Sequence, residues 1–238
     1  MESEWNERYM LRLAAAYYRG RAIRTGMPAL EETLMNPPLD ALRADQLERI
    51  AALGCAAEDK LYYFKRTHEE MARVKRVMGF LRSVAFDSLL DVGSGRGVFL
   101  LPFLEQFPWV GVTSLDVLPH RVQFMSDLHA GGVDMLSAFQ ADICSADIPD
   151  RSADIVTMLE VLEHIEQVDK AIERAVRIAR RHVVVSVPSK EDDNPEHIHL
   201  LTKPVLTALF ERAGCTRLRF DGVNGHLIMV ATIERQGD

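Results

Sequence analysis

The sequence predicts an α/β fold with a mostly parallel seven-stranded sheet, helices on both faces, an antiparallel C-terminal hairpin and an N-terminal helical cap. From Asp87 onward, short apolar runs alternate with helical patterns, which is typical of a parallel sheet covered on both faces. Before that point helical spacing dominates and strand signals are few. We therefore expect a helical cap over residues 1–82 and an α/β core over residues 83–238.

The N-terminal region contains three stretches with the apolar spacing of helices. Trp5–Arg24 and Asp40–Leu53 are the first two, and the segment Gly26–Pro38, which holds three prolines, separates them as a loop. A third helix over Glu69–Leu81 places apolar side chains on one face and leads directly into the first strand. These helices form the expected cap.

The core is predicted as strands separated by amphipathic helices. The helix over Val168–Ala179 carries an apolar stripe at helical spacing, which suits packing on a sheet. Another helix begins after Thr202, which is a residue type favoured as N-cap, and stops at Gly214. Parallel strands are expected at Ser88–Val92, Val110–Asp116, Ala138–Gln140, Ala153–Met158 and Val183–Val187.

The C-terminal segment predicts a β-hairpin. Two β-rich runs, Thr216–Phe220 and His226–Ile233, are separated by a short segment rich in Asp, Asn and Gly, the residue types that favour tight turns. The two runs complete the seven strands.

Composition and charge narrow the class of function. The 238 residues are 47% hydrophobic and 26% charged, as in ordinary globular proteins. No apolar run approaches the roughly 20 residues of a membrane span, and residues 1–12 carry charges where a signal peptide needs its apolar segment. We expect a cytoplasmic protein with no membrane partner. The net charge of −7 argues against general attraction to nucleic-acid backbones.

Residues 89–97, Leu-Leu-Asp-Val-Gly-Ser-Gly-Arg-Gly, predict a strand, a tight turn and a helix start. Glycine permits positive φ and lets a ligand approach the backbone, so the turn suits a small molecule beside a helix N-terminus. Dinucleotide-binding turns have a small residue at the position of Val98. In addition, the carboxylate of Asp91 would repel a pyrophosphate. A cationic, zwitterionic nucleoside such as S-adenosylmethionine (SAM) fits better.

The same turn resembles the first motif of the class I SAM-dependent methyltransferases, Asp/Glu-x-Gly-x-Gly-x-Gly, through Asp91, Gly93, Gly95 and Gly97. The resemblance extends over about two thirds of the chain. It implies a seven-stranded core that ends in an antiparallel hairpin, and it implies methyl transfer from SAM.

Acidic side chains at the ends of the next strands are candidates for SAM binding. Asp116 closes the second strand and suits the two ribose hydroxyls, although an acid there also serves as a helix N-cap. The family places an acid at Asp142, which would accept the adenine amino group while Ile143 packs on the ring. The residues expected at the cofactor are Asp91, Gly93, Ser94, Gly95, Gly97, Asp116, Val117, Asp142, Ile143 and Glu160.

The segment after the fourth strand allows two interpretations. Glu160, Glu163 and His164 have the spacing i, i+3 and i+4, so on a helix they share one face. With His197 or His199 they form a set suited to a divalent cation, and the pattern resembles the metal site of the small-RNA 3′-terminal 2′-O-methyltransferases.

The interpretation that we favour has no metal: Glu160 borders the SAM pocket, and His164, or else His199, removes the proton of the acceptor. The alternative metal ligands are Glu160, Glu163, His164 and His199.

The expected function is methyl transfer from SAM to an oxygen or nitrogen of a small molecule. The first alternative is a metal-dependent 2′-O-methyltransferase of RNA 3′ ends, with RNA as partner. The second is a SAM-binding module without catalysis.

Overall fold

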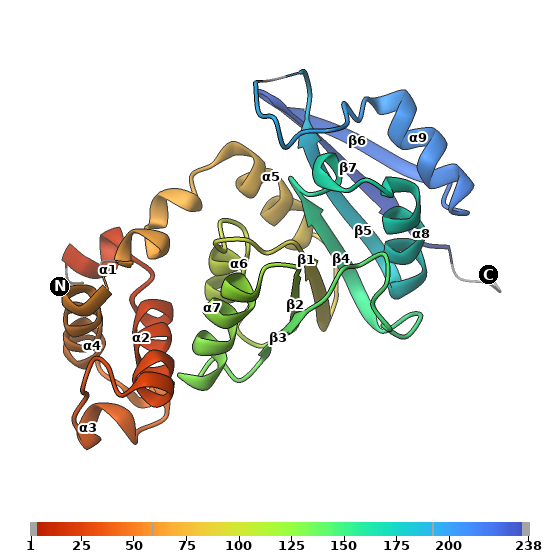
Figure 1. Ribbon diagram of the computed structural model, residues 1–238. Coiled ribbons are helices and arrows are strands. Elements are labelled where there is room, and N and C mark those ends of the chain that lie inside the picture. Colours follow the sequence, from red (N-terminus) through yellow and green to blue (C-terminus); the bar gives the residue numbers. More distant parts are fainter. Residues whose placement is uncertain (1–3, 59, 192, 235–238) are drawn as a thin grey trace. The chain divides into compact units, whose positions relative to one another are not determined.

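The computed structural model describes residues 4–58, 60–191 and 193–234 (Figure 1). Seven strands form one sheet in the order β3-β2-β1-β4-β5-β7-β6, so the predicted α/β fold is confirmed. The strands are β1 Ser88–Val92, β2 Gly111–Asp116, β3 Leu136–Gln140, β4 Ala153–Leu159, β5 Ala179–Pro188, β6 Arg217–Val223 and β7 His226–Thr232. The chain groups into unit 1, Met1–Met71 with Ser94–Gln140, and unit 2, Ala72–Gly93 with Ala141–Asp238. The boundary predicted at residue 82 stays a prediction.

Unit 1 contains the parallel pair β2 and β3 and a group of helices. Helix α7 packs against both strands, and α2 lies between α7 and α4 (Figure 1). The helices are α1 Glu4–Arg8, α2 Leu11–Thr25, α3 Glu32–Met35, α4 Ala44–Glu58, α6 Leu100–Gln106 and α7 Pro119–Ala130, with 3₁₀ turns at Leu39–Ala41, Leu61–Phe64 and Arg66–His68.

Glycines allow α2 and the end of α7 to meet at backbone distance. A Cβ atom on Gly20 would lie 1.8 Å from the carbonyl oxygen of Asp127, and one on Gly131 would lie 1.7 Å from that of Ala16. Beside this crossing, the Arg24 guanidinium donates two hydrogen bonds of 2.8 and 2.7 Å to the buried Asp127 carboxylate. Close packing and a bidentate ion pair thus join the two helices.

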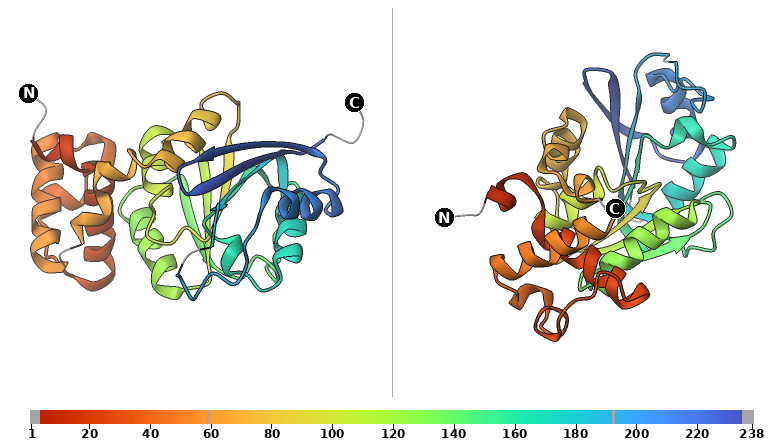
Figure 2. Two further views of the ribbon diagram at one scale, coloured as in Figure 1. Left: turned by 90° about the horizontal axis from the view of Figure 1, so that it is seen from above. Right: turned by 60° about the vertical axis from the view of Figure 1, so that its left-hand side comes forward.

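Unit 2 contains the strands β1, β4, β5, β7 and β6, with helices on both faces. Helix α5, Ala72–Leu81, covers one face, while α8, Val168–Ile178, and α9, Lys203–Arg212, lie on the other (Figures 1 and 2). Strands β1, β4 and β5 are parallel, so their carboxyl ends share an edge. Strand β7 runs antiparallel to β5 with His226 opposite Pro188, which places its first residue at that edge too.

The C-terminal hairpin is confirmed. Strands β6 and β7 pair in antiparallel fashion, and Asn224 and Gly225 connect them. Gly225 takes a φ of 84°, a conformation that favours glycine.

The N-terminal region departs from the prediction at two points. The expected helix over Trp5–Arg24 is split into α1 and α2, because Tyr9 forms an isolated bridge with Lys65 and the N–H of Met10 donates to the carbonyl of Phe64. The segment Gly26–Pro38, predicted as a loop, contains the single-turn helix α3.

The other predicted elements are present, most of them with shifted ends. Helix α4 begins at Ala44 and α5 at Ala72, a few residues later than expected, whereas β5 starts earlier, at Ala179. Thr202 is the N-cap of α9 by position, although its side chain makes no capping hydrogen bond. Among the described residues, no helix combines the length and apolar character needed to span a bilayer.

Candidate active site

The glycine-rich turn follows β1 and precedes α6. Gly93, Gly95 and Gly97 take φ values of 69°, 55° and 78°, where side chains are strained. A Cβ atom on Gly97 would also lie 2.7 Å from the Leu101 side chain. All three glycines therefore serve the conformation of the turn, which leaves its backbone uncovered by side chains at these positions.

Asp116 holds this turn to the end of β2 within unit 1. Its Oδ2 accepts a 3.0 Å hydrogen bond from the N–H of Gly95, and its Oδ1 accepts one of 2.9 Å from the N–H of Leu118, the N-cap residue of α7. The next residue, Val117, is exposed, and its carbonyl accepts from the Gln140 side chain at the end of β3. A carboxylate has about four lone-pair sites, so Asp116 retains capacity for hydroxyl donors.

Ser94, the first residue of the turn in unit 1, is nearly buried. The hydroxyl of Ser114 in β2 donates a 2.8 Å hydrogen bond to the Ser94 hydroxyl. The turn is thus tied to β2 both here and through Asp116. Unit 1 brings together Ser94, Gly95, Gly97, Asp116 and Val117.

In unit 2, Asp91 lies near the end of β1 and is 3% exposed. Its Oδ1 accepts a 2.6 Å hydrogen bond from the hydroxyl of Thr157, the residue opposite it in β4. This contact orients the carboxylate. A role for Asp91 toward a ligand stays a prediction.

Asp142 and Ile143 follow β3, in a turn of unit 2. The Oδ1 of Asp142 accepts the N–H of Cys144 at 2.8 Å, and its side chain is exposed, whereas Ile143 is 2% exposed. Burial, followed by the Asp142 carboxylate, raises the pKa of the Cys144 thiol. The thiol therefore stays protonated and is no candidate nucleophile.

Glu160 lies outside any helix, so the prediction that it shares a helical face with Glu163 and His164 is wrong. It has a φ of 58°, and only Leu162–His164 form a short 3₁₀ helix. The Oε1 of Glu160 accepts a 2.7 Å hydrogen bond from the Ser186 hydroxyl, and its Oε2 lies 3.0 Å from Nδ1 of His226. These contacts hold a backbone conformation that costs about 1–3 kcal/mol elsewhere.

Ser186 and His226 are the site residues that sequence reasoning missed. Ser186 is fully buried near the end of β5, and His226 begins β7. Both lie toward the edge formed by the carboxyl ends of β1, β4 and β5. Their position in the predicted strands could have indicated them. An antiparallel last strand begins at the edge of the sheet where its parallel neighbour ends, so the last residues of β5 and the first residue of β7 lie together.

The histidines gather differently from the predicted metal set. Among the described residues, one oxygen of Glu163 and one ring nitrogen each of His164 and His197 lie within 4.8 Å of one another. Glu160 is paired with His226 instead, and His199 directs Nε2 to the carbonyl of Ile165 at 3.1 Å. The four-residue set Glu160, Glu163, His164 and His199 is therefore not brought together.

His164 is exposed, and its Nδ1 lies 2.9 Å from the carbonyl oxygen of Glu196. A carbonyl only accepts, so this contact places the proton of a neutral imidazole on Nδ1 and leaves Nε2 with a lone pair. This arrangement suits a proton acceptor.

Comparison with known proteins identifies the family to which this chain belongs. A methyltransferase domain family matches residues 62–219, more than half of the chain. The YcgJ protein of Bacillus subtilis superposes with a TM-score of 0.56 at 15% identity, over 68% of this chain and 98% of that chain. A SAM-dependent methyltransferase of Aquifex aeolicus gives 0.52 at 20% identity, over 68% and 98%.

An O-methyltransferase family protein of Burkholderia thailandensis gives a TM-score of 0.55 at 14% identity, over 71% of this chain and 59% of that chain. Identities this low support the fold alone, while the family match covers the glycine-rich turn, Asp116 and the segment after β4. The chain belongs to the methyltransferase domain family and is a SAM-dependent methyltransferase with the class I fold.

Proposed function

We propose that this methyltransferase acts on an oxygen or nitrogen atom of a small molecule, with His164 as the proton acceptor. The observation that carries the proposal is the exposed His164 ring, whose Nδ1 faces the Glu196 carbonyl. It stands just after β4, and ligands in open α/β sheets bind outside the carboxyl ends of the strands.

Each unit carries, at the turn or at its strand ends, residues that we propose for SAM binding. The Asp116 carboxylate, already fixed by the N–H of Gly95, would accept ribose hydroxyls. Asp91, oriented by Thr157, would face the cationic part of the cofactor, and Asp142 the adenine amino group. The other residues that we propose for SAM binding are Gly93, Ser94, Gly97, Val117, Ile143 and Glu160.

Methyl transfer depends on the alignment of the acceptor atom with the methyl group more than on a covalent bond to the protein. SAM supplies a methyl group on a sulfonium, and transfer is an in-line displacement. The chain has to hold the acceptor atom about 3 Å from that methyl group and remove its proton where it has one. Nε2 of His164 would take that proton, while the Glu196 carbonyl holds Nδ1–H and fixes the ring orientation.

His199 is the second proposed base. Its Nε2 faces the carbonyl of Ile165, so only Nδ1 keeps a lone pair in the neutral ring. The side chain is only half-buried, which leaves room for access.

Binding of the cofactor tests the SAM site. We expect S-adenosylhomocysteine to bind with a micromolar dissociation constant and NAD far more weakly, because Asp91 precedes the glycines and Val98 replaces the small residue of dinucleotide-binding turns. Titration calorimetry on the purified chain measures both. Tighter binding of NAD would overturn the assignment of the turn to SAM.

Asp116→Asn should weaken S-adenosylhomocysteine by about 1–3 kcal/mol, or roughly 5- to 150-fold, because a charged acceptor for the ribose hydroxyls is lost. Asn is preferred to Ala since its carbonyl oxygen can still accept the N–H of Gly95, whereas Ala would remove the acceptor of both N–H groups. The exposed Asp134→Asn serves as the charge-matched control in the same unit. Equal affinities of the two variants would restrict Asp116 to a structural role.

The cluster of Glu163, His164 and His197 favours one alternative, a metal-dependent methyl transfer to the terminal ribose of RNA. Carboxylate and imidazole groups this close together suit a borderline divalent cation, which would lower the pKa of a coordinated hydroxyl. Chelation separates the two proposals, as set out with the His164 variant below.

A further inference from the structure

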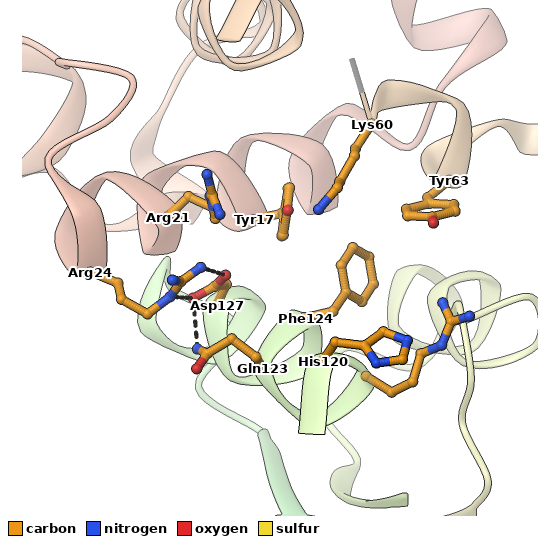
Figure 3. Close-up of a pocket in the computed structure, with 10 residues that line it drawn as sticks. Tyr17, Arg21, Arg24, Lys60, Tyr63, His120, Gln123, Phe124 and Asp127 are labelled. Atoms are coloured by element: carbon orange, nitrogen blue, oxygen red, sulfur yellow. Dashed lines mark hydrogen bonds and ion pairs between the residues drawn. The ribbon is translucent and has the colours of Figure 1, made fainter. Parts of the chain in front are cut away.

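A cavity of about 270 Å³ lies within unit 1, between α2, the segment at Lys60 and α7. Figure 3 shows Arg21, Tyr17 and Lys60 on one side and Phe124 and His120 of α7 on the other. The residues that line the cavity differ from those of the glycine-rich turn and from the two proposed bases. It combines an aromatic wall with an excess of positive charge.

Three aromatic rings form a continuous wall. Tyr17 and Phe124 are nearly buried, with ring centroids 4.9 Å apart. Tyr63 meets Phe124 edge to face at 5.6 Å. Rings arranged in this way present faces and edges on which a flat apolar group can pack.

In the part of the chain that the structure describes, four cationic side chains line the cavity, and two carboxylates form ion pairs with members of this group. Asp127 is engaged by Arg24 through two hydrogen bonds and also accepts one from Gln123 (Figure 3). Glu58 pairs with Arg21 and lies 3.9 Å from Lys60.

The fourth cation is Arg121. The hydrogen bond with the Tyr62 hydroxyl lowers the pKa of Tyr63 most, and the Arg121 guanidinium lowers it further. Among the described residues, Arg21, Arg24, Lys60 and Arg121 outnumber the two carboxylates by two charges, and the aromatic wall lies beside them.

We propose that this cavity binds a small aryl anion, a carboxylate or phosphate carried on a single ring. The ring would pack on Phe124 and Tyr63, and the anionic group would face Lys60 and Arg121. The volume lies just below the lower limit of about 300 Å³ for sites of drug-sized ligands, which suits a single ring with one anionic group. The proposal concerns binding alone and holds whether or not the site after β4 transfers a methyl group.

The test is a titration of the full chain with benzoate, phenyl phosphate and benzamide, followed by calorimetry or NMR shifts. We expect both anions to bind at least 10-fold more tightly than benzamide, the neutral isostere of benzoate. The tighter of the two anions identifies the anionic group that the cavity prefers.

Variants locate the site. Lys60→Met with Arg121→Met should weaken benzoate at least 10-fold, because both replacements keep an unbranched, flexible side chain and remove the positive charge. Arg43→Gln, an exposed cation of unit 1 paired with Asp45, is the control and should leave binding unchanged. Both altered side chains are partly exposed, and thermal unfolding checks that the double variant is folded. If it is not, Lys60→Met alone should still weaken benzoate several-fold.

Two results would overturn the proposal. One is equal affinity for benzoate and benzamide, which would show that the cavity recognises no charge. The other is wild-type benzoate affinity in the folded Lys60 variants, which would place the anion elsewhere.

Discussion

Replacing Gly20 by Ala should destabilise the protein by about 3 kcal/mol or more, the largest effect that we expect from the loss or gain of a single methyl group. The new Cβ would lie 1.8 Å from the backbone oxygen of Asp127 in α7. No rotamer relieves a clash with backbone, so α2 and α7 have to separate. Separation also strains the bidentate Arg24–Asp127 pair. Denaturant unfolding followed by circular dichroism measures the loss.

Gly79→Ala is the matched control, because Gly79 is also a helical glycine but has no atom within 4 Å of its Cβ position. There the better helix propensity of Ala should stabilise the protein, by up to about 1 kcal/mol. Gly131→Ala probes the same crossing from the other helix, at 1.7 Å from the Ala16 oxygen, and should behave like Gly20→Ala. A Gly20 variant within 1 kcal/mol of the wild type would mean that the crossing is looser than described.

Replacing His164 by Ala should lower kcat by about 10²- to 10⁴-fold, the usual contribution of a general base. The affinity for S-adenosylhomocysteine should stay unchanged, because the proposed role concerns only the acceptor. Release of S-adenosylhomocysteine with an acceptor found among small hydroxyl and amine compounds measures the rate. His129→Ala, in the last turn of α7, is the control and should keep full activity.

Chelation extends the same experiment. If His164 acts as a base without metal, activity survives EDTA, and His197→Ala and Glu163→Gln cost far less rate than His164→Ala. If Glu163, His164 and His197 together bind a metal ion, all three variants lose activity to a similar extent, since removal of one ligand disorders the site. Loss of activity on chelation, restored by a divalent cation, would replace the proposed mechanism by the metal-dependent one.

Local patterns were enough to predict the elements whose burial is decided along the chain. Strand β1 is a short apolar run ended by glycines, and its bounds Ser88–Val92 are as predicted. Helix α8 shows its buried stripe directly in the sequence. The break at Tyr9 and Met10 could not be predicted, because partners at Phe64 and Lys65 cause it, and helical spacing continues through the break.

The candidate site likewise has one part that local sequence predicts and another part that it does not. The glycine-rich turn is a local motif, so its three positive φ values follow from the glycines themselves. The contacts of Glu160 with Ser186 and His226 depend on the pairing of β4, β5 and β7, which sequence spacing does not contain. Helical spacing misplaced Glu160 for a related reason: its positive φ is held by those distant partners.

The order in which unit 1 is assembled along the chain has a consequence for synthesis on the ribosome. Helix α2 ends at Thr25, but its packing partner α7 begins only at Pro119. At synthesis rates of roughly 5–20 residues per second, the nascent α2 waits on the order of 5–20 s before that partner exists. Its glycine face, around Gly20, remains uncovered during this interval. A recombinant fragment intended to keep α2 packed as in the whole chain therefore has to extend beyond Ala130, the end of α7.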